Sequence, residues 1–405
     1  MSGNDGGLSR RAFLRGSATT ALVAAGAASG LGVPGVGEAS AAPTFHGKHQ
    51  AGILTSPERA HVVVSLDVTT ESRAELTDYF RTLTEQIRGI VAGGPVTEAF
   101  NAGIAPDNGM LGPVIPANQL TPTVSIGASL FDRRFGLADR KPLHLTLMKS
   151  FPNDDLDQTR CHGDVVVQFQ AAERDTVTHA LRRIMQATDG VVQPRWRLDG
   201  FVNPPRPTGV PRNLFGFNDG VSNPDVTSAA QMDALVWADP AKEPAWAAGG
   251  TYVVIRTIRQ LVEFWDRVSV EEQETIIGRR RDSGAPLGEN SVNDAPNFAA
   301  DPQGNTTPLT AHIRLANPRT AATADSRILR RAVNYDRGLD VNGNLDQGLI
   351  FICYQQDIAR QFEAIQTRLI NEPMVDYVSP VGGGYYFTLP GVTGPDDYFA
   401  SGLLA

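Results

Sequence analysis

One pattern occurs twice in this chain, 184 positions apart, and it limits the possible folds more than any other feature. Residues 164–185 have the pattern of a strand, a short polar turn and a helix that begins at an acid, Glu173. Residues 348–369 repeat this order, with Asp357 at the start of the helix. Self-similarity at a long, fixed spacing indicates two copies of one structural unit. We therefore expect two related halves.

Further apolar periodicities extend each copy and predict its other elements. The strands expected in the first half are 61–68, 122–126, 143–149, 164–170 and 191–201, and the helices are 76–90 and 173–185. The strands expected in the second half are 250–258, 349–354 and 385–389, and the helices are 270–277 and 357–370. The order is that of the β-α-β-β-α-β unit of ferredoxin-like folds. The predicted class is α+β, with two ferredoxin-like halves whose antiparallel sheets are faced by helices.

A proline-rich stretch separates the two halves. Residues 203–211 contain four prolines, which lack a backbone donor and interrupt regular structure. We place the boundary here, between a first domain of residues 42–210 and a second domain of residues 211–405.

Residues 1–41 have the organisation of an export signal. Arg10 and Arg11 lie in Ser-Arg-Arg-Ala-Phe-Leu, which matches the twin-arginine pattern. A weakly hydrophobic run follows, and Ala39-Ser40-Ala41 is a cleavage signal of the A-x-A type. Pro34 and several glycines interrupt a run that is already too short to span a bilayer, so we expect removal of the segment and no membrane anchor. The expected location is the periplasm, the cell envelope or the extracellular space.

The charge and the cysteines exclude several classes of function. The formal net charge is −8, which argues against a nucleic-acid partner because such a partner requires a basic surface. Cys161 and Cys353 are the only cysteines and lack the C-x-x-C spacing of zinc-ribbon or iron–sulfur sites. They could form one disulfide, but Cys353 lies in an apolar run that favours a buried thiol.

A histidine at the end of a long polar loop is the first candidate for chemistry. His312 follows the loop 278–310, whose length indicates a functional role. A neutral imidazole can ligate a metal, and as the sole protein ligand it suits haem iron. A lone histidine beside apolar residues is more often a satisfied core residue, so the segment by itself leaves both interpretations open. Export by the twin-arginine route, which carries folded proteins, favours a prosthetic group.

Two further stretches could supply groups opposite such a cofactor. Arg330 lies eighteen positions after His312, and Arg331 follows it. An arginine offers a fixed positive charge and five donors to a developing anion. Asp219 lies in the turn 215–224, whose glycines could let the backbone pass close to a flat ligand. A carboxylate beside an arginine could move a proton between the oxygens of hydrogen peroxide, although the stretch alone is also an ordinary Gly/Asn/Asp turn.

In combination, these motifs resemble the dye-decolorizing peroxidase family, and within it the exported, twin-arginine-targeted deferrochelatase/peroxidase branch. The resemblance extends from about residue 46 to residue 392. The stretches that carry it are His49-Gln50-Ala51-Gly52-Ile53, Cys161-His162-Gly163-Asp164, Gly216 to Gly220, His312 to Arg319, Leu329-Arg330-Arg331, Tyr354-Gln355 and Gly382-Gly383-Gly384-Tyr385. Each stretch is weak evidence alone, but the combination is specific.

The resemblance implies a dimeric α+β barrel-like fold with one haem b per chain in the C-terminal half. It makes His312 the proximal ligand of the haem iron and Asp219 the distal acid and base. Arg330 becomes the distal arginine and a haem contact, preferred to Arg331 because the family shows the eighteen-residue spacing. The other residues expected to line the haem are Gly220, Val221, Ser222, Asn317, Pro318 and Arg319.

The function implied is a haem peroxidase that reduces hydrogen peroxide and oxidises bulky phenolic or dye-like donors in one-electron steps. The alternative is a deferrochelatase that releases iron from haem, leaves the porphyrin intact and has partners in an iron-uptake system. A third interpretation is an exported ferredoxin-like binding protein without a cofactor. The resemblance leaves the oligomeric state open, including a homo-oligomer, and we expect neither a nucleic-acid partner nor stable membrane insertion.

Overall fold

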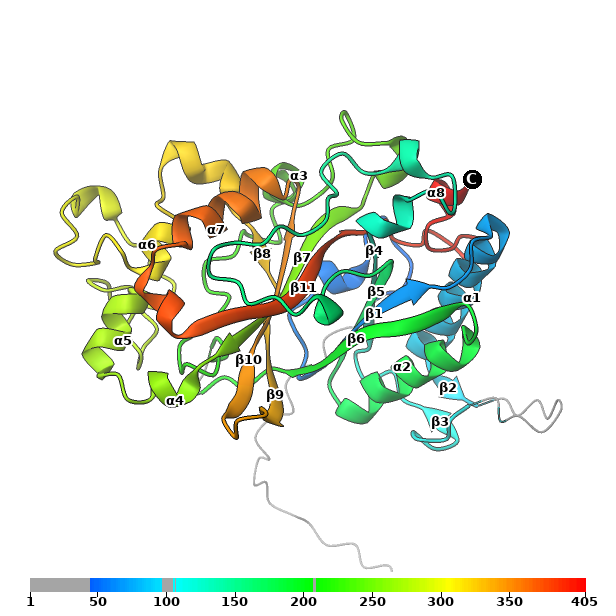
Figure 1. Ribbon diagram of the computed structural model, residues 1–405, viewed down its shortest axis with the longest axis horizontal. Helices are drawn as coiled ribbons and strands as arrows, with labels where there is room; N and C mark the ends of the chain where they lie inside the picture. Colours follow the sequence, from blue (N-terminus) through cyan, green and yellow to red (C-terminus); the bar gives the residue numbers. More distant parts are fainter. Residues whose placement is uncertain (1–43, 97–104, 106, 207–208) are drawn as a thin grey trace, which may run out of the picture. The chain divides into compact units, whose positions relative to one another are not determined.

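Two β-α-β-β-α-β units follow one another in the chain (Figure 1). The computed structural model describes residues 44–96, 105, 107–206 and 209–405. The expected export signal, residues 1–41, lies outside the described residues.

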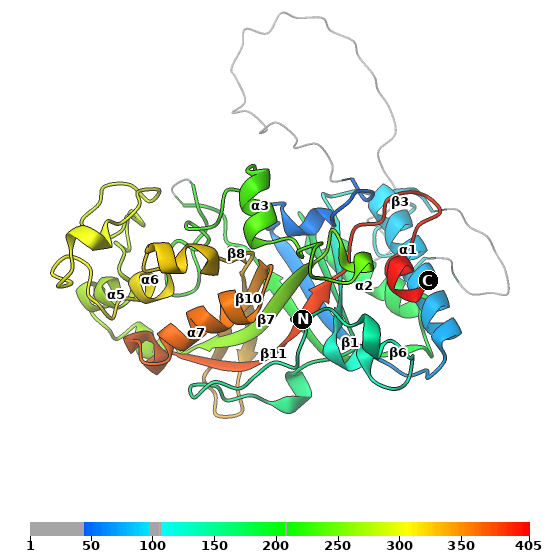
Figure 2. The same cartoon turned by 90° about the horizontal axis from the view of Figure 1, so that it is seen from above.

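The first unit has the strand order β4-β5-β1-β6, and every neighbouring pair is antiparallel. Its helices α1 and α2 lie side by side and cover one face of this sheet (Figures 1 and 2). The elements are β1 Ala60–Val68, α1 Arg73–Ala92, β4 Thr121–Gly127, β5 Val165–Ala171, α2 Arg174–Ala187 and β6 Val192–Phe201.

The second unit repeats this arrangement in the strand order β11-β7-β10-β9, again with antiparallel neighbours. Its elements are β7 Thr251–Gln260, β9 Val333–Leu339, β10 Leu345–Gln355, a π-helical turn Ala359–Glu363 continued by α7 Ala364–Leu369, and β11 Val378–Thr388. β5 and β10 are each the third long strand of their unit, and each is followed by a helix. The two ferredoxin-like halves expected from the 184-residue repeat are therefore confirmed.

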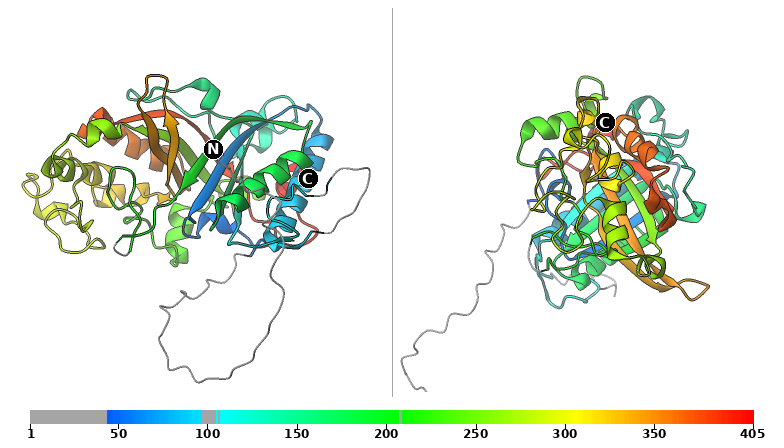
Figure 3. Two further views of the ribbon diagram at one scale, coloured as in Figure 1. Left: turned by 90° about the horizontal axis from the view of Figure 1, so that it is seen from below. Right: turned by 90° about the vertical axis from the view of Figure 1, so that its left-hand side faces the viewer.

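The two sheets join edge to edge into a ring of strands. β4 pairs with β11 at three positions, and β6 pairs with β9 at one, Phe201 with Asn334. The ring runs β7-β11-β4-β5-β1-β6-β9-β10 and closes through the pairing of β10 with β7. Figure 3 shows the strands of both units between α1 and α2 on one side and the segment that follows β7 on the other.

Alternate residues of a strand enter different apolar layers. Val62 and Val64 of β1 belong to the layer that includes the buried faces of α1 and α2. Val63 belongs instead to the layer between the two units, with Ile255 of β7 and Ile352 of β10. Both faces of these strands are buried, and this explains their nearly continuous apolar sequences.

The remaining elements are short. Those between β7 and β9 are α4 Val262–Trp265, α5 Val270–Ile277, α6 His312–Ala316 and β8 Leu329–Arg330. Those elsewhere are β2 Gly94–Pro95, β3 Val114–Ile115, α3 Ala229–Leu235 and α8 Ser401–Leu404.

Two sequence-based assignments of strands were wrong. The segment 143–149 is not a strand, although Leu143, Leu145 and Leu147 alternate. Leu145 is buried, whereas Leu143 and Leu147 are each more than half exposed, so the alternation does not mark a sheet face. Strand β9 was missed because its second half is polar and exposed.

Cys161 and Cys353 are both free and buried, which confirms the buried thiol predicted for Cys353. Within the described residues, no helix has the length and hydrophobicity to cross a membrane. The domain boundary between residues 210 and 211 stays a prediction.

Stability should depend on pH through His61, a buried residue of β1. Burial lowers the pKa of His61 to about 4 from 6.5, although its Nε2 interacts with the carbonyl of Glu58 at 2.8 Å. A lowered folded-state pKa means that the unfolded chain binds the proton more tightly between these values. The contribution of neutral His61 to the free energy of unfolding is fully present above pH 6.5. It falls by about 3 kcal/mol as the pH approaches 4.

Denaturant unfolding of the wild type and of His61→Gln between pH 4 and 7 measures this contribution. The variant should lose less stability over that interval, because it has no imidazole to protonate. Equal pH dependence in both proteins would contradict the assignment.

Candidate functional site

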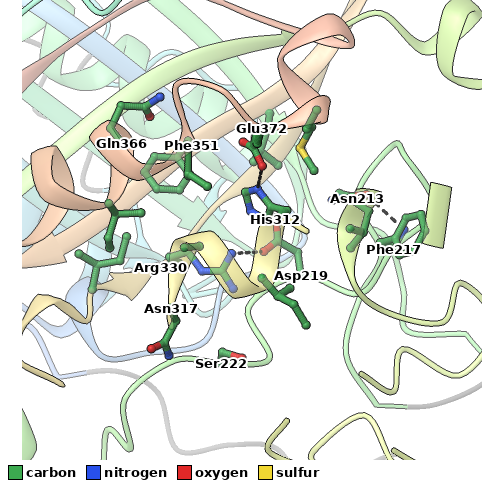
Figure 4. A pocket seen from close by; sticks show the side chains of 18 of the residues that line it. Asn213, Phe217, Asp219, Ser222, His312, Asn317, Arg330, Phe351, Gln366 and Glu372 are labelled. Atoms are coloured by element: carbon green, nitrogen blue, oxygen red, sulfur yellow. Dashed lines mark hydrogen bonds and ion pairs between the residues drawn. The ribbon is translucent and has the colours of Figure 1, made fainter. Parts of the chain in front are cut away.

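His312 is the first residue of α6 and faces a cavity in the second unit (Figure 4). Its Nδ1 interacts with Oε2 of Glu372 at 2.7 Å. Glu372 is buried and directly precedes Pro373, where a short 3-10 helix begins. Arg368 of α7 fixes the other end of α6, since it donates to the carbonyls of Leu315 and Ala316 at 2.9 and 3.0 Å. The imidazole is thus held by two segments that follow it in the chain.

The carboxylate of Glu372 controls the charge of His312. Burial lowers the pKa of His312, but the negative charge of Glu372 and its hydrogen bond raise this pKa by more. The net effect is a raised pKa, to which Asp219 also contributes while Arg330 opposes it. The second ring nitrogen, Nε2, has no hydrogen-bond partner among the described residues and is free to bind a ligand.

Asp219 forms an ion pair with Arg330 in the same cavity (Figure 4). Its Oδ1 lies 3.2 Å from Nη1 of Arg330 and accepts a hydrogen bond from the backbone of Gly220 at 2.6 Å. Gly220 has φ +80°, a conformation that glycine adopts without strain. Oδ2 of Asp219 has no partner among the described residues, so it can accept or carry a proton.

The two neighbouring arginines point in different directions. Arg330 faces the cavity beside Asp219. Arg331 instead donates to the carbonyls of Ile53 and Leu54 at 3.2 and 2.6 Å and does not line the cavity. The geometry therefore favours Arg330 for chemistry and gives Arg331 a structural role.

The cavity has a volume of about 260 Å³ and lies mainly between β7, β10, α6 and α7. Of the residues expected from the sequence, it is lined by Asp219, Val221, Ser222, His312, Asn317, Arg319 and Arg330. Gly220 and Pro318 do not line it, although both are adjacent to residues that do. Much of the remaining wall is apolar and includes Ile277, Ile313, Ile328, Leu349, Phe351, Leu369 and Met374.

Three cavity arginines lack a carboxylate partner. None of Arg279, Arg319 and Arg327 forms an ion pair with a described Asp or Glu. Arg279 is buried and donates to the carbonyls of Gly284 and Val292 and to Ser222 Oγ. Burial, together with the charges of Arg330 and Arg319, lowers the pKa of Arg279 to about 10. A buried cation of this kind requires an anion for compensation.

The sequence analysis did not identify Glu372, Arg279 or Arg327. Glu372 lies sixty positions after His312, and no local pattern connects the two. Arg279 had an indirect signal, because it lies in the long loop 278–310 that was expected to be functional.

Among the described residues, no three His, Cys, Asp or Glu side chains lie close enough together to hold a metal ion.

Two family models match the chain. One, described as Dyp-type peroxidase, N-terminal, matches residues 50–202, and the other, described as Dyp-type peroxidase, C-terminal, matches residues 210–393. The matched regions correspond to the two structural units, and the cavity belongs to the second.

Curated relatives and solved structures agree with this match. The chain is 47% identical over 366 residues to a deferrochelatase of Yersinia pestis, covering 89% of this chain and 84% of the relative. It is 47% identical over 367 residues to the deferrochelatase of Escherichia coli strain K12, covering 89% and 86%. Ferric DtpA from Streptomyces lividans superposes with a TM-score of 0.81 at 31% identity, over 90% of this chain and 97% of that chain. A DyP-type peroxidase from Cellulomonas bogoriensis gives 0.79 at 34% identity, over 89% and 97%.

The replacement Glu372→Gln should lower the pKa of His312, because it removes the negative charge that stabilises the imidazolium. An NMR titration of the His312 ring in the ligand-free protein measures the shift. Glu363→Gln is the control, since Glu363 pairs with Lys149 and does not line the cavity. A titration of His312 that is the same in Glu372→Gln and the wild type would contradict the coupling.

Proposed function

Because the chain belongs to the Dyp-type peroxidase family, we propose that it binds one haem b in the cavity and uses it to reduce hydrogen peroxide. The electron donors would be bulky phenolic or dye-like molecules, oxidised in one-electron steps. The observation that supports this most strongly is the convergence of two pairs on one cavity, His312 with Glu372 and Asp219 with Arg330.

His312 has the features of a ligand to haem iron. Its Nδ1 is engaged by Glu372, which leaves Nε2 as the atom that can bind the metal. A hydrogen bond from the other ring nitrogen to a carboxylate fixes the orientation of a ligating imidazole and makes it more basic. His312 would hold the iron, and Glu372 would keep the ring in place.

The rest of the cavity also fits haem b. Its apolar wall suits the macrocycle, and haem b carries two carboxylates that can compensate cationic side chains. Arg279, Arg319 and Arg327 have no carboxylate partner in the part of the chain that the structure describes, and Arg279 is buried. Charge-assisted bonds from arginine to carboxylate are among the strong hydrogen bonds in proteins. The cationic residues of the cavity therefore support an anionic ligand, as this proposal requires.

The bound haem would supply a redox-active iron at which peroxide can be reduced. The protein supplies proton transfer and charge stabilisation. Asp219 takes a proton from one peroxide oxygen, holds it at Oδ2 and returns it to the oxygen that departs. Arg330 donates N–H groups to that oxygen while negative charge builds on it. Because Arg330 also pairs with Oδ1 of Asp219, the two groups act at neighbouring points.

The names of the curated relatives favour a second candidate function, deferrochelation. In that reaction iron leaves the haem, and two protons take its place on the porphyrin nitrogens. The same cavity would then receive haem as a substrate. Export by the twin-arginine route would place this activity outside the cytoplasm. Its partners there would belong to an iron-uptake system, and the protein could act as a homo-oligomer.

His312→Ala should yield mostly haem-free protein after purification, because the replacement removes the ligand to iron. The measurement is the absorbance of bound haem per chain after reconstitution. His144→Ala is the control, since His144 pairs with Asp357 outside the cavity. Full haem content with an unchanged spectrum in His312→Ala would show that the ligand is another residue.

Arg330→Leu should retain haem but consume peroxide at least about a hundredfold more slowly, the usual loss when one charge-stabilising donor is removed. Stopped-flow measurement of peroxide consumption per bound haem gives the value. Arg337→Leu is the control, because Arg337 pairs with Asp346 on the β9–β10 hairpin. Wild-type turnover in Arg330→Leu would show that this arginine does not act on peroxide.

The same variant separates the two candidate functions. Without oxygen and peroxide, and with a reductant present, iron release would produce free porphyrin, detected by its fluorescence. Arg330 stabilises a charge that arises only from peroxide, so Arg330→Leu should release porphyrin as the wild type does. The absence of porphyrin from the wild type under these conditions would exclude deferrochelation.

A further inference from the structure

Arg330 lies on β8, a strand of only two residues that is paired on one side. Its partner is β10, where Cys353 lies opposite Arg330 and Tyr354 lies opposite Leu329. The backbone of Arg331 donates to the carbonyl of Ile352 at 2.8 Å. In an antiparallel ladder this bond makes Arg330 a non-hydrogen-bonded position, so its own N–H and C=O point away from β10. These groups need partners from elsewhere.

The carboxamide of Asn223 supplies both partners. Its Oδ1 accepts from the backbone N–H of Arg330 at 2.9 Å, and its Nδ2 donates to the Arg330 carbonyl at 3.0 Å. An amide can do this because it carries one acceptor and one donor group side by side. Asn223 thus occupies the open edge of β8 as a residue of a neighbouring strand would. Arg327 adds a bond from Nη2 to the carbonyl of Asn223 at 3.3 Å.

Asn223 lies four positions after Asp219 in the chain. Its side chain therefore connects the segment that carries Asp219 to β8, the strand that carries Arg330. The ion pair between Asp219 and Arg330 cannot fix this relation alone. Its side chains are 21% and 28% exposed, so solvent partly screens the charges, and the pair has one contact between two flexible side chains. The two hydrogen bonds from Asn223 to the backbone of Arg330 fix both the position and the orientation of that backbone.

We propose that Asn223 is a positioning residue that holds Arg330 in register with Asp219. The inference rests on the proposed function, because that function gives Arg330 its role. Asn223 itself need not touch peroxide or haem. It acts through the backbone of Arg330, and it limits the distance that the guanidinium can move from the carboxylate.

Asn223→Ala removes both bonds to Arg330. We expect peroxide consumption per bound haem to fall roughly ten- to a hundredfold, the scale for a displaced catalytic group, while haem content stays that of the wild type. A second readout does not depend on turnover. Hydrogen–deuterium exchange of the haem-loaded protein should be faster in a peptide covering residues 327–333. Asn344→Ala should change neither result, since Asn344 binds Asp340 at the tip of the β9–β10 hairpin.

Asn223→Asp keeps the size of the side chain. It tests whether Asn223 positions Arg330 even if Asn223→Ala does not fold. An ionised carboxylate can still accept from the N–H of Arg330, but it cannot donate to the carbonyl. The variant should therefore be slow near neutral pH. Its rate relative to the wild type should recover as the pH approaches about 4, where a free aspartate side chain regains its proton. A purely space-filling role for Asn223 predicts a ratio that does not depend on pH.

Two outcomes would overturn the inference. One is wild-type turnover together with wild-type exchange of residues 327–333 in Asn223→Ala. The other is a pH-independent rate ratio in Asn223→Asp. Either result leaves the proposed function standing as long as Arg330→Leu is slow. Wild-type turnover in Arg330→Leu would contradict the role of Arg330 itself, so the two failures are distinguishable.

Discussion

The burial of both faces of the strands is the constraint on which the rest of this structure depends. One face of the first sheet is covered by α1 and α2, and the layer between the two units is formed by residues such as Val63, Ile255 and Ile352. Burial of apolar surface contributes about 25 cal/mol per Å² to the free energy of folding. Nearly every residue of β1, β4, β5 and β7 is buried. A polar ligand cannot enter such a layer without disrupting it. The cavity therefore forms outside the interface between the units, on the opposite face of β7 and β10, where α6 and α7 lie.

The two units share a strand order but differ in their first crossover, and this difference locates the chemistry. In the first unit the chain between β1 and β4 contains the long helix α1 and the small β2–β3 hairpin. In the second unit the corresponding chain, residues 261–332, is divided into short elements and long loops. It contributes His312, Arg330 and the arginines without carboxylate partners. The strand scaffold is common to both units, and the irregular crossover supplies much of the cavity wall, which Asp219 and Glu372 complete from segments outside it. A site can be added in this way to a fold that does not itself require it.

The electrostatics of the cavity make the ligand-free protein less stable than it would be with apolar residues in the same places. A buried guanidinium such as Arg279 bonds to carbonyls and a hydroxyl, none of which compensates its charge. An uncompensated buried charge costs several kcal/mol. The strands and helices of both units must offset this cost, which an anionic ligand such as the proposed haem would reduce. Asp219 lies beside Arg330 and Glu372 beside His312, whereas Arg279, Arg319 and Arg327 have no carboxylate partner among the described residues.

The sequence by itself determined the repeat and most strands, and it predicted a shared site for Asp219 and His312, which the structure places on one cavity. Hydrophobic periodicity is a local property of the chain, and it located β5, which is buried on both faces, and the apolar part of β10. Asp219 and His312 were predicted from the combination of motifs that resembles one family, because each local stretch alone left its interpretation open. The tertiary structure alone decided what lies beside these groups. Glu372 reaches His312 only because α6 and the segment after α7 pack together. The sequence preferred Arg330 to Arg331 by its spacing from His312, but only the structure shows that Arg330 faces the cavity while Arg331 bonds to the backbone of Ile53 and Leu54. Contacts of this kind depend on the relative placement of distant segments, which no periodicity within a segment can encode.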